Sequence, residues 1–447
     1  MFLGSSHLYF GINPNVIWKN NKLLTYNLGM NEQPMWLTYF YLIEALKYQK
    51  PKVLVLETFY LENTREYKNN NGFSKENINR ISLDPLKFSL NKINAIKESV
   101  PENQFTDYIL NINKYHDRWK KLYKNDFMRN DEPYFYKGFT SSLKVYKETR
   151  IRDLKHKTGR RGMELHNKSL DYTDKIIQLA KENNIEVVFI KTPLAQAIFR
   201  QEFTDALVSI KEYADDNKID FIDYNKIYDE IGFDFLKHMS DASGHLNKYG
   251  AEIISKHIGN YLKSKYFKDK KNEDLIVNEW DKTFLLYKEK EGKRIAKEKI
   301  KYARTLKEYL NYAKSLDLLV LTAVRDDGSG QYRNYKKSFK SIGLESNLNK
   351  KFRWSYVGVK NMKTGFAKEI IDTTKVSINF KSEKLDIKLT SIGGNKPGNM
   401  SSILINGKEY SKNLRGHNFV IIDLKEQKVL DAFNIDTHGD DKLLIKK

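Results

Sequence analysis

The chain has 447 residues, 40% of them hydrophobic, and a formal net charge of +21. This length exceeds one ordinary core, so we expect two domains. The absence of cysteine excludes disulfides, thiolate catalysis and cysteine-ligated zinc. No apolar run reaches the roughly 18 residues that a membrane-spanning helix needs.

The positive charge fits a solvated lysine-rich surface, or else binding to an anionic polymer or an anionic membrane face. The lysine and arginine residues are spread along the chain and form no zinc-finger, basic-zipper or RNA-binding pattern. We therefore expect no nucleic-acid partner.

The first 60 residues alternate strand and helix signals. Residues 1–3 predict a buried strand, residues 16–18 a short helix and residues 23–27 a second strand. Pro34 begins an amphipathic helix over residues 35–48, because proline is favoured in a first turn. Pro51 ends it, and residues 52–57 predict an apolar strand. Continuous apolar strands between helices are typical of a parallel sheet that is covered on both faces.

Residues 61–165 are polar and rich in Asn, Lys and Tyr, which predicts a mostly helical insertion that covers the mouth of a site. Helix and strand signals then alternate again. The order predicts one α/β domain with a doubly wound parallel sheet over residues 1–265. The expected helices are residues 170–182, 203–216 and 249–266, and the expected strands are residues 185–190 and 219–223.

Dense charge over residues 266–305 predicts a partly helical linker and a domain boundary. Beyond it, strands rich in Val and Ile are separated by turn residues. We therefore expect a second, smaller domain over residues 306–447, mixed but mainly β. Its expected elements are a helix over residues 306–316 and strands over residues 318–324, 376–380, 384–389, 402–405 and 419–423.

Serine, aspartate and histidine occur in a catalytic order. Gly4-Ser5-Ser6-His7 follows the first strand, and Asp241-Ala-Ser-Gly-His245 precedes the last helix of the first domain. A serine is a weak nucleophile until a base, oriented by an acid, takes its proton. The joint pattern predicts a serine hydrolase or acyltransferase. Taken separately, Gly-Ser-Ser also fits a common turn, and Asp241 with His245 also fits a helix cap.

These motifs resemble the SGNH/GDSL hydrolase superfamily over about residues 1–265, and more closely its bacterial cell-envelope, O-acyltransferase-associated branch. The resemblance implies Ser6 as nucleophile, His245 as general base and Asp241 as the orienting acid. It also implies that the backbone N–H groups of Ser6 and Gly29 bind the oxyanion.

Two departures from the family pattern affect this site. Asp241 and His245 are separated by three residues instead of two, so Gly244 absorbs the extra residue or His245 acts with Ser6 as a dyad. The family's Gly-x-Asn-Asp block is absent, and Glu57-Thr58-Phe59 follows the third strand. The candidates for the missing side-chain oxyanion donor are Asn31, Gln33 and Thr58.

Other polar residues have two interpretations each. His7 is expected to pack beside the nucleophile. Lys191, at a strand end, either faces the pocket or is solvated. His116-Asp-Arg-Trp119 either lines the cleft or lies on a surface helix. No metal-ligand cluster, Walker loop or GxGxxG occurs, so we expect neither a metal nor a cofactor.

The second domain carries Arg325-Asp-Asp-Gly-Ser329, Phe352-Arg-Trp354 and Arg415-Gly-His-Asn418. These motifs resemble the interleukin-like EMT inducer (ILEI) domain, also found as the stem domain of a protein O-mannose N-acetylglucosaminyltransferase, in a permuted order. The resemblance implies sugar binding by Asp326, Arg353 and Arg415. Guanidinium and carboxylate groups suit paired hydrogen bonds to vicinal hydroxyls. The alternative is a structural ion pair.

Together these features predict a serine esterase or O-acyltransferase that modifies a cell-surface polysaccharide, such as a teichoic or capsular polymer. The resemblance implies a membrane-bound O-acyltransferase as a partner, and the charge suits an anionic membrane face. The alternative is a non-catalytic glycan-binding surface protein on a decayed hydrolase fold. Because Met1 already adjoins a core strand, we expect a signal or anchor before it, and a location in the cell envelope, outside the cell.

Overall fold

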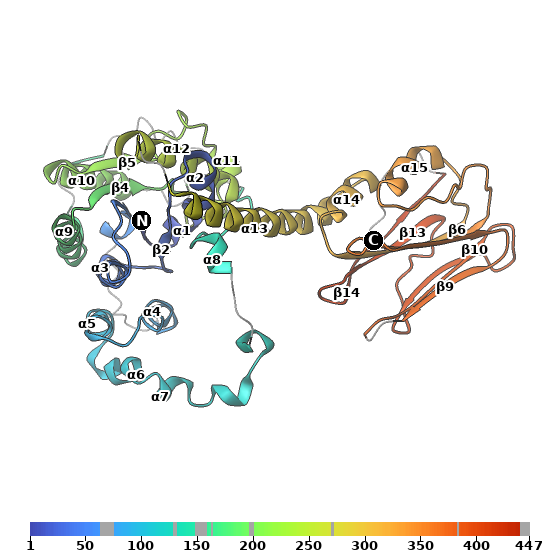
Figure 1. Cartoon of the computed structure of the whole chain (residues 1–447), viewed down its shortest axis with the longest axis horizontal. Helices are drawn as coiled ribbons and strands as arrows, with labels where there is room; N and C mark the ends of the chain where they lie inside the picture. Colours follow the sequence, from blue (N-terminus) through green and yellow to red (C-terminus); the bar gives the residue numbers. More distant parts are fainter. Residues whose placement is uncertain are drawn as a thin grey trace. The chain divides into compact units, whose positions relative to one another are not determined.

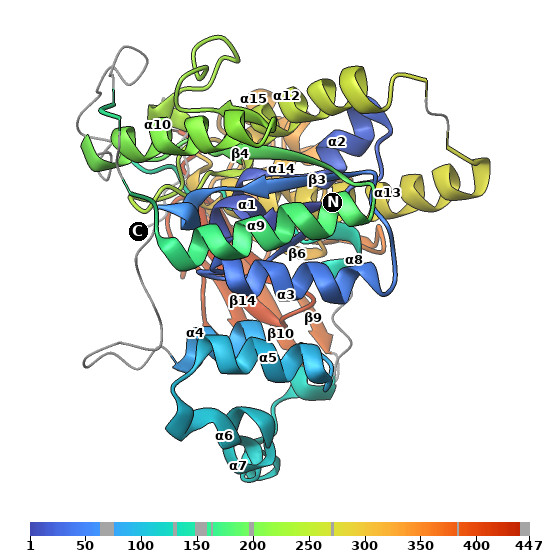
Figure 2. The same cartoon turned by 90° about the vertical axis from the view of Figure 1, so that its left-hand side faces the viewer.

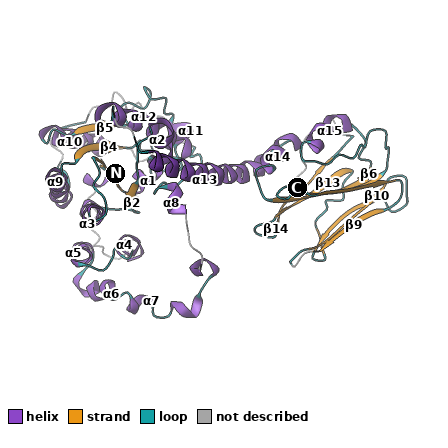
Figure 3. Cartoon of the chain, viewed as in Figure 1, coloured by secondary structure: helices purple, strands orange, loops and turns teal. Residues whose placement is uncertain are grey.

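The computed structural model describes residues 1–62, 76–127, 132–147, 159–161, 164–195, 201–269, 272–381 and 384–438. The chain divides into two compact units, Met1–Tyr287 (unit 1) and Lys288–Lys447 (unit 2). The division falls within helix α13 (Asp274–Lys299), inside the segment that was predicted as a linker. Figure 3 shows helices around a sheet in unit 1 and mostly strands in unit 2.

Unit 1 contains a five-stranded sheet in which every pairing is parallel, in the order β2-β1-β3-β4-β5. This confirms the predicted α/β class. The strand order reverses at β1 and β3, which are neighbours, and such a switch point leaves a crevice at the carboxyl ends of the strands. The strands are β1 (Phe2–Gly4), β2 (Asn27–Gly29), β3 (Val53–Glu57), β4 (Glu186–Lys191) and β5 (Asp220–Asp223).

Both faces of this sheet are buried, because alternate residues of each strand enter different cores. Leu54 and Leu56 of β3 pack in one core with helices α3 and α9. Val53 and Val55 pack in the other with α1, α2 and α12. Figure 1 labels these helices around the sheet. Their bounds are α1 (Ser6–Gly11), α2 (Pro14–Asn21), α3 (Met35–Leu46), α9 (Asn167–Glu182), α10 (Gln201–Asp216), α11 (Phe235–His238) and α12 (Lys248–Tyr266).

In the insertion at residues 61–165, the structure describes short helices joined by turns over residues 76–127 and 132–136, and chain without helix over residues 137–147, 159–161 and 164–165; residues 63–75, 128–131, 148–158 and 162–163 lie outside the described part. Helices α4 to α7 lie at the lower margin of unit 1 in both Figure 1 and Figure 2. The elements are η1 (Phe59–Leu61), α4 (Glu76–Leu83), α5 (Leu90–Ser99), η3 (Glu102–Gln104), α6 (Phe105–Ile109), α7 (Ile112–Tyr115), η4 (Arg118–Lys121), η5 (Lys124–Phe127) and α8 (Glu132–Tyr136).

The second strand differs from its prediction. Residues 23–27 were expected to form it, but β2 is Asn27–Gly29, paired with Phe2 to Gly4 of β1. Lys22 ends α2 in a left-handed conformation, and the chain then needs residues 23–26 to return to the sheet. Leu23 is buried, so hydrophobicity there reflects packing and not strand pairing.

Unit 2 forms a mixed, mostly antiparallel sheet with β6 at its centre. The main order is β12-β11-β10-β6-β13-β14, while β7 pairs with β6 and β8, and β9 with β10. This confirms the predicted separate, mainly β region. The strands are β6 (Leu318–Asp326), β7 (Ser355–Asn361), β8 (Ala367–Asp372), β9 (Val376–Lys381), β10 (Asp386–Gly393), β11 (Met400–Ile405), β12 (Lys408–Glu409), β13 (Gly416–Asp423) and β14 (Lys428–Ile435).

Residues of β6 again alternate between two cores. Leu318 and Val320 pack beneath α14 (Leu306–Ala313) and α15 (Tyr332–Lys340), whereas Leu319 and Leu321 pack among the strands. A short 3-10 turn, η7 (Ile300–Tyr302), precedes α14. Thr305 and Glu308 form a capping box at the start of α14, each side chain binding the other's backbone N–H.

Candidate active site

Ser6 is presented by a tight strand-to-helix turn. β1 ends at Gly4, and Ser5 caps α1 by accepting a hydrogen bond from the His7 N–H at 3.3 Å. A Cβ on Gly4 would lie 2.7 Å from the Cβ of Glu57 on β3, so the turn requires glycine. The turn therefore places Ser6 at the carboxyl end of the sheet, beside the switch point.

The structure brings Ser6, His245 and Asp241 together. Ser6 Oγ lies 2.8 Å from His245 Nε2, and His245 Nδ1 lies 2.9 Å from Asp241 Oδ2. Because Nδ1 faces Asp241, the ring proton is favoured on Nδ1. Nε2 then carries no proton and can accept the one from Ser6. Of the two arrangements left open by the sequence, a triad and a dyad, the geometry is that of a triad.

Gly244 accommodates the extra residue of the Asp-x-x-x-His spacing. Its φ of +92° lies in the left-handed region that favours glycine. The backbone thereby turns so that the His245 N–H points to Asp241 Oδ1 at 3.3 Å. Ser243 also donates to Asp241 Oδ1 through its N–H at 3.0 Å and its hydroxyl at 2.7 Å.

Asp241 is held as a carboxylate. Partial burial would raise its pKa, but the hydrogen bonds from His245 and Ser243 outweigh burial and hold that pKa well below its usual range. An ionised Asp241 is what the imidazolium form of His245 needs during proton transfer.

Gly29, the predicted oxyanion donor, lies at the end of β2 beside the turn that holds Ser6. It pairs with Gly4 across β1 and β2, and a Cβ on Gly29 would lie 2.8 Å from Gly4 O and 3.2 Å from Ser5 O. The Ser6 N–H is in the first turn of α1, where N–H groups have no intrahelical acceptor. The donor roles of both groups stay predictions.

Two of the three candidate side-chain donors are used elsewhere. Gln33 is buried, donates to Thr38 Oγ1 at 2.9 Å and accepts from the Met30 N–H at 2.9 Å. Thr58 is buried and donates to Ile190 O at 3.2 Å. Asn31 lies half-buried in the turn after β2 and is the candidate that this geometry leaves.

Buried charged residues at the ends of β3 and β4 lie next to the turn that holds Ser6. Lys191 is fully buried and donates to Glu62 Oε1 at 2.6 Å, so neither a pocket-facing nor a solvated lysine describes it. Glu57 accepts from Ser5 Oγ at 3.2 Å and from the Phe59 N–H at 2.9 Å. Burial raises the pKa of Glu57 to about 7, despite the opposing charge of Lys191.

His7 packs near the Ser6 turn, as expected. Its ring stacks on Phe59 with centroids 4.0 Å apart and lies 5.2 Å from the His245 ring. Burial, with the charges of His245 and Lys191, holds the pKa of His7 well below its usual value. The residues from His116 to Trp119 are exposed, which agrees with the surface interpretation.

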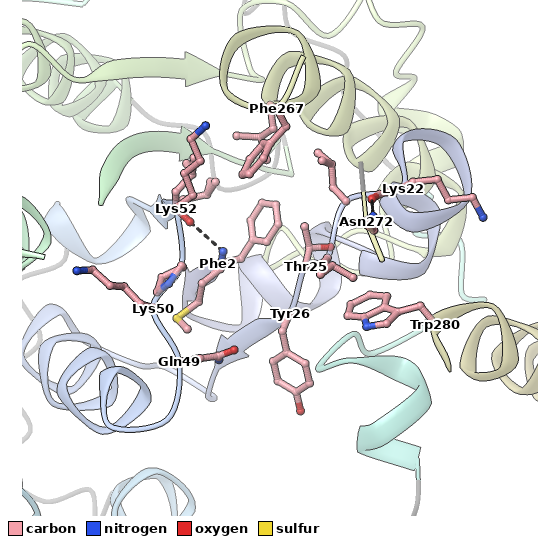
Figure 4. Close-up of a pocket in the computed structure, with 17 residues that line it drawn as sticks. Phe2, Lys22, Thr25, Tyr26, Gln49, Lys50, Lys52, Phe267, Asn272 and Trp280 are labelled. Carbon is pink, nitrogen blue, oxygen red and sulfur yellow. Dashed lines mark hydrogen bonds between the residues drawn. The ribbon is translucent and has the colours of Figure 1, made fainter. Parts of the chain in front are cut away.

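A cavity of about 330 Å³ in unit 1 lies elsewhere (Figure 4). Phe2 and Val53, at the amino ends of β1 and β3, line it, with Lys52, Phe267 and Trp280. Ser6 follows the carboxyl end of β1, so this cavity is separate from the triad.

In unit 2, the predicted sugar-binding residues come from three elements: Asp326 ends β6, Arg353 lies just before β7 and Arg415 just before β13. Arg353 Nε lies 3.5 Å from Asp326 Oδ1. Arg415 instead binds Asp436 through two bonds, from Nε to Oδ1 at 3.0 Å and from Nη2 to Oδ2 at 2.8 Å. Asp436 raises the pKa of Arg415, with smaller contributions from Asp326 and Asp327. Both arginines remain about half exposed.

The sequence missed three neighbours of the triad. Ser243 binds the acid, Glu57 binds Ser5, and Tyr9 lies one turn after Ser6 on α1. Burial raises the pKa of Tyr9, and a hydrogen bond with Ser6 opposes that shift. The i, i+3 spacing of Ser6 and Tyr9 was the available signal for the last of them.

Among the described residues, no group of three or more His, Asp or Glu side chains could hold a metal ion. Comparison with models of known protein families finds no match, and comparison with curated proteins finds no similar sequence.

Proposed function

We propose that this chain is a serine esterase or O-acyltransferase that modifies a bacterial cell-surface polysaccharide, of the SGNH type in unit 1 and the ILEI type in unit 2. One observation carries the proposal. Ser6 Oγ, both ring nitrogens of His245 and a carboxylate oxygen of Asp241 form a continuous line with separations of 2.8 and 2.9 Å. That arrangement is the one that activates a serine for acyl transfer.

In the first half-reaction, Ser6 Oγ attacks the carbonyl carbon of an ester, and its proton passes to His245 Nε2. The N–H groups of Ser6 and Gly29 stabilise the oxyanion. The tetrahedral intermediate then expels the alcohol, which takes the proton from His245, and an acyl group remains on Ser6. Asp241 holds the imidazole in place and stabilises its positive charge.

In the second half-reaction, His245 takes a proton from the acceptor, which attacks the acyl-Ser6 carbonyl. The intermediate then expels Ser6 Oγ, which takes the proton back from His245, and the acyl group leaves on the acceptor. Water as acceptor gives an esterase, and a glycan hydroxyl gives a transferase. In unit 2, Asp326, Arg353 and Arg415 would bind the glycan, which raises its effective concentration for the covalently joined unit 1. A membrane-bound O-acyltransferase would be the natural acyl source at the cell envelope.

The test is turnover of p-nitrophenyl acetate by the wild type, Ser6→Ala and His245→Ala, with labelling by a fluorophosphonate serine probe. We expect both variants to lose turnover and Ser6→Ala to lose labelling. Ser264→Ala, an exposed serine of α12, is the matched control. Adding a cell-wall glycan then separates the two reactions, because acyl transfer to the glycan identifies a transferase.

Full turnover in Ser6→Ala would overturn the proposal. Absence of both turnover and labelling in the wild type would favour the alternative, a non-catalytic glycan-binding surface protein.

A further inference from the structure

Residues 110–127 of the insertion expose an unusual number of large apolar side chains. Globular proteins seldom place several such side chains together in contact with water. Seven are between 42% and 77% exposed: Leu110, Ile112, Tyr115, Trp119, Leu122, Tyr123 and Phe127. We call residues 110–127 the apolar-basic segment.

The segment folds as short helical turns that are held at one end. Tyr108, just before it, is buried, and the guanidinium of Arg80 lies 4.3 Å from its ring. Tyr115 donates to Asp84 Oδ2 at 2.6 Å. These contacts fix the start of the segment on α4, and Figures 1 and 2 both show α7 at the margin of unit 1 away from the sheet.

Positive charge accompanies this apolar surface. The segment contains five Lys and Arg residues and two Asp residues. Lys114, Arg118, Lys120 and Lys121 are exposed. Asp117 and Asp126 pair with Lys120 and Arg118 respectively, which leaves an excess of positive charge on the segment as a whole.

We propose that the apolar-basic segment is a membrane-binding surface that inserts its aromatic and aliphatic side chains into the headgroup region of an anionic bilayer. Trp and Tyr favour this region because their rings are apolar and their edges polar. Lys and Arg stems lie along apolar surface while their charges reach anionic headgroups. In the part of the chain that the structure describes, no helix could span a membrane. The four-residue helical turns of the segment itself suit a peripheral contact.

The excess positive charge of the apolar-basic segment favours an anionic membrane over a protein partner. A protein partner would bury the apolar side chains but would need matching acidic groups, whereas anionic lipid supplies both an apolar layer and negative charge. Binding through this segment does not depend on the chemistry at Ser6. It would hold unit 1 beside the membrane at which the proposed acyl donor is made.

Co-sedimentation of the full chain with phosphatidylcholine vesicles, with and without phosphatidylglycerol, tests the proposal. We expect binding to the anionic vesicles that weakens as salt is raised. Trp119→Ser/Phe127→Ser should weaken it by about tenfold or more, because both side chains leave the interface. Lys120→Gln/Lys121→Gln should weaken binding to anionic vesicles alone.

The matched control is Leu275→Ser/Leu285→Ser, two exposed leucines of α13 in unit 1, which should bind like the wild type. Circular dichroism confirms that each variant is folded. Brominated lipid should quench fluorescence of the wild type more than that of Trp119→Phe.

Equal binding by Trp119→Ser/Phe127→Ser and the wild type would overturn the proposal, as would failure to bind either vesicle. Binding of a soluble glycan or a protein by this segment, without vesicle binding, would also overturn it. None of these readouts uses an acyl substrate, so they are independent of the outcome at Ser6.

Discussion

Ser6, His245 and Asp241 differ in their contact with solvent. Ser6 is 6% exposed, the side chain of His245 19% and that of Asp241 42%. Water can therefore reach Asp241, the most exposed member of the hydrogen-bonded line from Ser6 through His245. The acid depends on Ser243 and on the backbone turn at Gly244 for its position, and not on burial.

Asparagine and alanine at residue 241 should behave differently. In Asp241→Asn, an amide N–H facing Nδ1 selects the tautomer with the proton on Nε2, which cannot accept from Ser6. We expect kcat/KM to fall by about 10²–10⁴-fold. In Asp241→Ala, water enters the exposed site in place of the carboxylate, and kcat/KM should fall less than in Asp241→Asn. The measurement is p-nitrophenyl acetate turnover, and equal, near-wild-type rates in both variants would indicate a dyad.

Gly244→Ala should impair the site through its backbone. Alanine is strained at φ +92°, and its Cβ would lie 3.1 Å from His7 Cε1. We expect a loss of about 1–2 kcal/mol in stability and a clear fall in kcat, because the loop that carries His245 must shift. Gly232→Ala is the control, since Gly232 also has a positive φ but meets no atom within 4 Å. Equal kcat values in the two variants would contradict this prediction.

The triad residues could be predicted from sequence, because their order and spacing carry the chemistry. The burial of Lys191 and its pairing with Glu62 could not be predicted. Its partner, Glu62, is 129 residues away, and a lysine at a strand end gives no sign of that pairing. The consequence of the extra residue before His245 also required the φ of Gly244.

At the level of elements, the carboxyl ends of β3 and β4 lie next to the turn that holds Ser6. Glu57 ends β3 and Lys191 ends β4, and both are buried. The Ser5 hydroxyl connects the turn to this layer through Glu57. The network therefore links the position of the Ser6 turn to the protonation of the buried Glu57 carboxyl.

Glu57 should make stability depend on pH. Its raised pKa of about 7 means that the folded state binds the proton more tightly than the unfolded state. The free energy of unfolding should thus fall as pH rises from about 4.5 to about 7, by an amount on the order of 3 kcal/mol. In Glu57→Gln this fall should be smaller, and what remains is expected from Glu62 and Asp223, whose pKa values burial also raises.

Urea unfolding of the wild type and Glu57→Gln across that range measures the difference. Glu186→Gln, at an exposed position on β4, is the control and should follow the wild type. Parallel curves for the wild type and Glu57→Gln would contradict the assignment of the pKa shift to Glu57.

Most elements of unit 1 could be predicted because buried parallel strands and amphipathic helices have distinct patterns. Strands β7, β8, β12 and β14 of unit 2 were not predicted, and neither was α15. Tyr332, Tyr335 and Phe339 of α15 recur at helical spacing and were a usable signal. No residue of β8 is buried, so its strand conformation depends on pairing with β7.

At the level of the whole molecule, two compact units carry the two proposed tasks. The triad belongs to unit 1, and the cluster of Asp326, Arg353 and Arg415 belongs to unit 2. Each unit has its own cores, so a change at one site should leave the other folded. We therefore expect the proposed acyl chemistry and the proposed glycan binding to be separable by mutation.

Arg415→Ala/Asp326→Asn should weaken glycan binding by about tenfold or more, because paired hydrogen bonds to charged groups are lost. Turnover of p-nitrophenyl acetate should stay at the wild-type level, and Ser6→Ala should show the reverse. Binding to cell-wall glycan is measured by co-sedimentation, with the exposed Arg333→Ala as control. Unchanged glycan binding in the double variant would show that these residues are only structural.

The separation of Ser6 and His245 by 239 positions also sets when the site can first work during protein synthesis. The turn that holds Ser6 can form once β3 has left the ribosome, because β1 pairs with it through Phe2 and Val55. The base arrives only after nearly all of unit 1 has been translated, since domains fold as their chain emerges. The nascent chain therefore carries Ser6 without its proposed base until residue 245 has been translated, and we expect no acyl chemistry at Ser6 before that point.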